Sequence, residues 1–173
     1  MNGDLNINNT DRNIEPLVFD NEYVNELYHN DTDGNDELTS LLSNAVCQGN
    51  ITHVMQLINA GADVNIETEC NITPLIIASF NGYSEIVKIL IQNGANINHR
   101  DNINRTSLIM ACRNGSINTV KILIENNADV NIKNSNGYTA IEIARACNHV
   151  NIVEYLLNNT STDSTPNHRG QNP

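Results

Sequence analysis

Histidine and cysteine are the first side chains to consider for chemistry, because they serve as metal ligands, nucleophiles and acid–base groups. The chain has five histidines and four cysteines. The cysteines are widely spaced with no Cys-x-x-Cys, and no two histidines have a metal-ligand spacing. No Cys–His–carboxylate set can be argued from the sequence. We therefore expect no catalytic residue, no metal site and no cofactor, with reduced thiols in the cytoplasm.

Individual positions support this interpretation. His53 falls where Ile86 and Ile152 lie one and three repeat lengths later, which predicts a half-buried helix residue. Cys112 takes a small position that Ser79 holds 33 residues earlier, which favours core packing over reactivity. Glycines follow a fixed period and form no phosphate-binding loop.

Charge and composition narrow the class of partner. The formal net charge is −11, and residues 1–35 alone carry eight acidic and one basic side chain. Nucleic-acid binding requires clustered Lys and Arg, which are missing here, so we expect no DNA or RNA partner. The first residues show no signal-peptide pattern and no apolar run is long enough for a bilayer, so secretion and membrane insertion are not expected. Asn enrichment is attributed to an AT-rich genome or to low complexity.

The elements that position these residues repeat every 33 residues. TPLIIA at Thr73–Ala78 returns as TSLIMA at Thr106–Ala111 and as TAIEIA at Thr139–Ala144, and SLLSNA at Ser40–Ala45 keeps the apolar positions. A second helical set follows each of these segments with i, i+3, i+4 spacing. Its members are Val54, Leu57 and Ile58, then Val87, Leu90 and Ile91, then Val120, Leu123 and Ile124, then Val153, Leu156 and Leu157.

Turn residues occur at fixed phase between these helices. Gly49, Gly82 and Gly115 are followed by Asn148, and the series Gly61, Gly94 ends in Asn127. Asn is the non-glycine residue that most readily adopts a positive φ, as the residue after a helix often does. We predict left-handed backbone at Asn127 and Asn148, and helices near Leu41–Gln48 and Thr52–Ala60 that repeat every 33 residues to Leu157.

These motifs resemble the ankyrin repeat, with its Thr-Pro-Leu-His-x-Ala segment and its Gly-Ala-Asp-Val-Asn before a β-hairpin. The second motif is matched at Gly61–Asn65, Gly94–Asn98 and Asn127–Asn131. The histidine of the first motif is replaced by Ile76, Ile109 and Glu142, which removes a side chain that normally links neighbouring repeats. The resemblance implies an all-α solenoid of four stacked helix-turn-helix units with short β-hairpin loops, near residues 67, 101 and 134, and only modest stability.

We divide the chain into three parts. Residues 1–35 form an acidic, Asn-rich flank, residues 36–159 hold four repeats, and residues 160–173 form a disordered tail. Within the flank, residues 16–29 are open to three interpretations: a short capping helix on the first repeat, a disordered acidic segment, or a peptide motif that another protein binds.

The resemblance also implies a monomer that binds a protein partner on a concave face made by hairpin tips and first helices. Apolar Ile72, Phe80, Ile103 and Tyr138 fall on this face, where they are either binding anchors or, for the two isoleucines, braces between hairpins. With Arg105 and Arg113 beside them, we expect a partner segment with carboxylates next to an apolar anchor. The predicted partner-binding residues are Glu69, Ile72, Phe80, Asn81, Asn102, Ile103, Arg105, Arg113, Asn114 and Tyr138.

Two functions remain open at this point. The first is a binding module that acts as a scaffold or a modulator. The second is an adaptor that recruits an enzyme, such as a ubiquitin ligase, through its flanking segments.

Overall fold

Four helical pairs, stacked side by side, make up the part of the chain that the structure describes. The structure is a computed structural model in which residues 34–67 and 70–160 are described. Its eight helices in these ranges are α2 (Gly34–Cys47), α3 (Ile51–Asn59), α4 (Pro74–Asn81), α5 (Ser84–Gln92), α6 (Ser107–Asn114), α7 (Ile117–Glu125), α8 (Ala140–Ala146) and α9 (Val150–Thr160).

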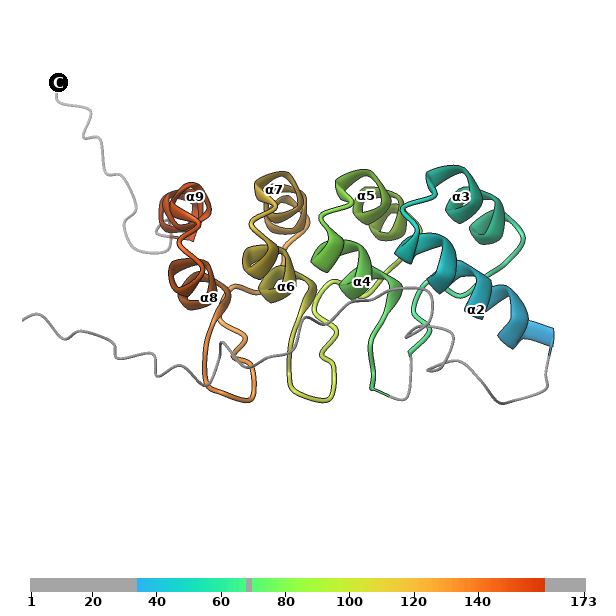
Figure 1. Cartoon of the computed structure of the whole chain (residues 1–173), viewed down its shortest axis with the longest axis horizontal. Coiled ribbons are helices and arrows are strands. Elements are labelled where there is room, and N and C mark those ends of the chain that lie inside the picture. The colour runs from blue at the N-terminus through green and yellow to red at the C-terminus, as the bar shows by residue number, and fades with distance from the viewer. Residues whose placement is uncertain (1–33, 68–69, 161–173) are drawn as a thin grey trace, which may run out of the picture.

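The helices form two layers. Helices α2, α4, α6 and α8 pack against one another in one layer, and α3, α5, α7 and α9 form the second (Figure 1). The connections between pairs project from the first layer, on the side away from the second layer (Figure 1). This arrangement confirms the all-α repeat fold, and it confirms that residues 87–91 lie in a helix.

The core is a stripe that neighbouring pairs share. Leu42, Leu75 and Leu108 are fully or almost fully buried at the same repeat position. In the second helix of each pair the same holds for Leu90, Leu123 and Leu156. Burial of one such side chain contributes about 1.5–3 kcal/mol, and each is covered by the neighbouring pair as well as by its own.

Threonine begins the first helix of the later pairs. Thr73 Oγ1 accepts a hydrogen bond from the N–H of Ile76 at 3.4 Å, and Thr106 Oγ1 accepts one from Ile109 at 3.3 Å. These contacts satisfy amide donors that have no partner within the helix. Pro74 takes the first helical position of α4, where its missing N–H costs nothing.

The first helix starts earlier than its repeat position predicts. Helix α2 begins at Gly34, whereas the repeat predicts a start near Leu41. In the later pairs, the position three residues before the first helical residue has positive φ at Asn71 and Asn104. The first pair has Leu38 there, and leucine avoids that conformation, so the chain continues as a helix.

Short turns connect the pairs, without strands in the described residues. The N–H of Asp101 donates to the C=O of Arg105 at 3.1 Å, and that of Asn134 donates to the C=O of Tyr138 at 2.9 Å. The β-hairpins that the resemblance implies are therefore reduced here to hydrogen-bonded turns. Neighbouring turns are joined by a backbone bond from Ser135 N–H to Ile103 C=O at 2.9 Å.

Asparagine side chains link successive connections. Asn65 accepts a hydrogen bond from the N–H of Asn96 at 2.7 Å and donates to the C=O of Gly94 at 3.0 Å. One repeat later, Asn98 accepts from the N–H of Asp129 at 2.8 Å. The terminal Asn of the Gly-Ala-Asp-Val-Asn motif thus fixes the spacing between neighbouring connections.

Left-handed backbone occurs where it was predicted, and at further positions. Asn127 and Asn148 have φ of 64° and 59°, which confirms the prediction. Asn71 and Asn104 also have positive φ, with Gly137 at the equivalent position of the next repeat. The sequence analysis missed this third 33-residue series, although it carries the same Asn-and-Gly signal.

Candidate functional site

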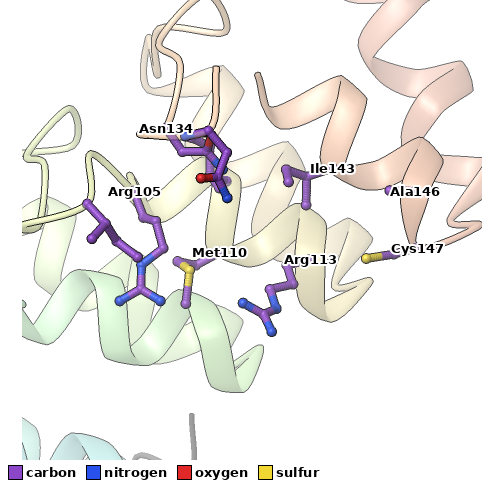
Figure 2. Close-up of a pocket in the computed structure, with 10 residues that line it drawn as sticks. Arg105, Met110, Arg113, Asn134, Ile143, Ala146 and Cys147 are labelled. Carbon is purple, nitrogen blue, oxygen red and sulfur yellow. The ribbon is translucent and has the colours of Figure 1, made fainter. Parts of the chain in front are cut away.

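The binding face that we examine, called the groove face below, consists of the projecting turns and the exposed side of α4, α6 and α8. A pocket of about 170 Å³ lies on it between the third and fourth pairs. The turns supply Ile103, Arg105, Asn134 and Asn136, and the helices supply Ile109, Met110, Arg113, Ile143, Ala146 and Cys147 (Figure 2). The turns and first helices therefore enclose a common hollow, as a groove-binding protein requires.

The repeat explains why the pocket lies here. Ala146 takes the position that Phe80 holds two pairs earlier and Arg113 holds one pair earlier. Both of those side chains are long and half-buried, whereas a methyl group leaves space beside α8. Met110 and Ile143, at equivalent positions of α6 and α8, supply apolar wall (Figure 2).

Three of the predicted binding residues, Ile103, Arg105 and Arg113, line this pocket. Ile103 is 49% exposed on its turn, which is high for an isoleucine, and its role as an accessible anchor is favoured over that of a buried brace. Arg113 reaches the pocket from the last turn of α6 (Figure 2).

Two predictions about the groove face are wrong. Ile72 is only 1% exposed, so it belongs to the core and not to a binding surface. Arg105 is 8% exposed, and its Nε lies 2.5 Å from Oδ2 of Asp101, which is itself 4% exposed. The charge of Arg105 is thus compensated inside its own turn and contributes little to a basic groove. Both residues lie at one repeat position, which packs inward at the base of the turn.

The other predicted residues lie outside the pocket. Phe80 packs half-buried against the core and Tyr138 is half-buried at the end of its turn. Asn102 is exposed, as is Asn114, whose Nδ2 donates to Ser116 Oγ at 2.7 Å. Asn81 is half-buried, and its Nδ2 is buried with no hydrogen-bond partner. Glu69 lies outside the described residues, as do residues 16–29.

Sequence analysis missed the pocket residues Met110, Ile143 and Asn134, because each was interpreted as part of the core or of a turn. The available signal was the size change at one repeat position, from Phe80 and Arg113 to Ala146. A small residue at a position where neighbouring repeats carry large ones marks a place where the surface is hollow.

The thiols near the pocket are not arranged for nucleophilic chemistry. Burial raises the pKa of Cys112 to about 12, and the nearby Cys147 raises it further. Partial burial also raises the pKa of Cys147, and the positive charge of Arg113 only opposes that shift. Both thiols are therefore protonated at neutral pH, whereas catalysis requires the thiolate. The core position predicted for Cys112 and the half-buried one predicted for His53 are confirmed.

Histidines outside the pocket support the turns. His149 Nε2 lies 3.1 Å from the C=O of Arg113, and His99 Nε2 lies 2.9 Å from the C=O of Asn71. Among residues 34–67 and 70–160, no three His, Cys, Asp or Glu side chains gather as a metal site. No helix in those ranges is both long enough and apolar enough to cross a membrane.

The position of the missing motif histidine is used in two other ways. Ile76 and Ile109 are buried there and add apolar contact between pairs. Glu142 instead accepts hydrogen bonds from the N–H and Oγ1 of Thr139, both at 2.7 Å, which forms a capping box at the start of α8.

Comparison with known proteins agrees with this architecture. A family model described as ankyrin repeats (3 copies) matches residues 17–101 and 98–168, which together cover most of the chain. A comparison with curated proteins finds no match. The matched ranges, the 33-residue step and the paired helices lead to one conclusion: the chain belongs to the ankyrin-repeat family.

Proposed function

We propose that this protein binds a partner protein through its groove face and acts as a scaffold or modulator. Ankyrin repeats are protein–protein interaction modules, and the turns and first helices of this chain enclose a hollow with an accessible apolar rim. The observation that carries the proposal is Ile103, which is 49% exposed at the edge of the pocket and beside Arg113. Apolar side chains flanked by Arg are typical of binding hot spots.

The opposite face supports the choice of surface. Lys88 and Glu125 lie exposed on the second helix layer, as does Glu154. Interface centres are depleted in charged residues, and an exposed, singly charged side chain there contributes little binding energy. The second layer therefore has the character of a solvated outer surface.

Affinity capture with the full chain tests the proposal. Proteins retained by the wild type are identified by mass spectrometry and compared with those retained by Phe80→Ala, Arg113→Ala and Lys88→Ala. We expect a specific partner to be lost with the first two variants and kept with the third. A partner that is kept by the first two variants and lost with Lys88→Ala would place the interface on the second helix layer instead.

The same capture separates the adaptor role from the scaffold role. An adaptor that uses its flanking segments should bring down an enzyme subunit whose retention does not depend on Phe80 or Arg113. A scaffold or modulator should bring down only proteins that depend on these residues.

A further inference from the structure

We propose that the pocket between α6 and α8 binds one apolar side chain of a partner peptide, with an adjacent carboxylate that pairs with Arg113. This inference rests on the proposed function, because it names the partner chemistry that the groove face recognises. It assigns specificity to a single pocket whose position is particular to this chain.

The size of the pocket selects its occupant. Its volume is about 170 Å³. A cavity of about 150 Å³ is large enough for benzene, so one phenylalanine ring or one leucine or methionine side chain fits. The apolar wall is supplied by Ile103, Met110 and Ile143 (Figure 2). Burial of such a side chain would contribute most of the binding energy at this position.

The charge of the pocket selects the neighbour of that side chain. The lining residues include two arginines and no carboxylate. Arg105 is already paired with Asp101, which leaves Arg113 as the cation that determines charge preference. Figure 2 shows the Cys147 side chain directed from α8 toward Arg113, so the guanidinium borders the hollow. A partner carboxylate one or two residues from the apolar anchor would complement this charge, in a chain that is otherwise acidic.

A random nonapeptide phage library, selected on the immobilised full chain, is the probe. We expect enriched peptides to share one Phe, Leu or Met with an Asp or Glu within two residues. Binding of the best synthetic peptide is then measured by fluorescence anisotropy. Replacement of its acidic residue by the matching amide should weaken binding about tenfold, as is typical for loss of one partner of a charged pair.

Two substitutions in the protein test the pocket itself. Ala146→Phe introduces the side chain that Phe80 already provides at the equivalent position, and it should fill the pocket and weaken binding about 30-fold or more. Ala60→Phe, the same change at an exposed residue at the end of α3, should leave binding unchanged. Arg113→Glu should reverse the preference, so that a peptide with Lys in place of its acidic residue binds better than the original. Circular dichroism checks that each variant is folded.

The outcomes separate this inference from the proposed function. If binding is lost with Phe80→Ala and unchanged by Ala146→Phe, the pocket does not hold the anchor although the groove face binds. If binding is unaffected by Phe80→Ala, Ala146→Phe and Arg113→Glu, both proposals are wrong. Enriched peptides without an acidic residue, or no enrichment at all, would also overturn the inference.

Discussion

Asp101 and Arg105 form an ion pair inside the turn before α6, where Oδ1 of Asp101 also accepts the backbone N–H of Arg105 at 2.8 Å. One repeat later the same geometry is built without charge. Asn134 Oδ1 accepts the N–H of Tyr138 at 3.0 Å, and the tyrosine side chain is half-buried. The turn thus requires a side-chain acceptor at its start, and the inward-packing residue determines whether that acceptor carries a charge.

The first prediction concerns this pair. Asp101→Asn keeps the acceptor for the backbone but leaves the buried guanidinium without its counter-charge, so the free energy of unfolding should fall by about 3 kcal/mol. The double substitution Asp101→Asn with Arg105→Tyr copies the next repeat and should recover most of that loss. Urea denaturation measures both. If Asp101→Asn alone matches the wild type, the ion pair has no role in holding the turn.

Asn127 offers a test of the left-handed positions. Its φ of 64° favours Gly or Asn, because a β-branched side chain collides with the backbone in this region. Asn127→Gly should be neutral or mildly stabilising, and Asn127→Val should destabilise by about 1 kcal/mol or more. Thermal denaturation compares the two variants. Equal melting temperatures would be inconsistent with the conformation described here.

The capping box at α8 should make stability depend on pH. The hydrogen bond from the Thr139 N–H lowers the pKa of Glu142 below its ordinary value. The folded state therefore favours the ionised carboxylate, and this stabilisation is complete above the unfolded-state pKa of about 4.3 and is lost as the pH falls through the lower folded-state value.

Glu142→Gln should accordingly cost about 0.5–1 kcal/mol at pH 7 and much less at pH 3. Chemical denaturation at both pH values measures the difference. Glu125→Gln, on the exposed side of α7, is the control for a general charge effect. A cost for Glu142→Gln that is the same at both pH values would show that the capping carboxylate contributes nothing.

Gly115 tests the contact between the third and fourth pairs. Its φ is 81°, and a Cβ added there would lie 2.5 Å from His149 Cε1. Gly115→Ala should destabilise through both backbone strain and this collision, whereas in a His149→Ala background only the strain remains. A double-mutant cycle should show a coupling of about 1 kcal/mol. Additive effects would mean that the imidazole moves away at no cost.

The sequence predicts the helices of this protein better than it predicts its surface. A 33-residue period that recurs in both helical sets determines which segments are helical, and Asn127 and Asn148 reveal turn conformation because Gly occupies the equivalent sites. The start of α2 was missed because the effect of Leu38 is visible only when the Asn71 and Asn104 positions are known to be left-handed.

Depth at a repeat position is harder to predict from one sequence. Ile72, Arg105 and Tyr138 are equivalent but differ in polarity, so the pattern did not show that this position packs inward. The pocket depends on a difference between repeats, at Ala146, rather than on what the repeats share. Periodicity captures the shared scaffold, and the binding surface lies in the departures from it.

Titration calorimetry with a partner obtained by affinity capture tests the central claim most directly, namely that the groove face carries the interface. Phe80→Ala and Arg113→Ala should each weaken binding by roughly 2 kcal/mol or more with helical content unchanged, and Lys88→Ala should have little effect. Lys121→Ala, predicted to act likewise, also removes a cation–π contact, with Nζ 5.7 Å from the Tyr155 ring centroid, so Lys88→Ala is the cleaner control. Lost binding in the lysine variants with full binding in the other two would contradict the claim and assign the interface to the second helix layer.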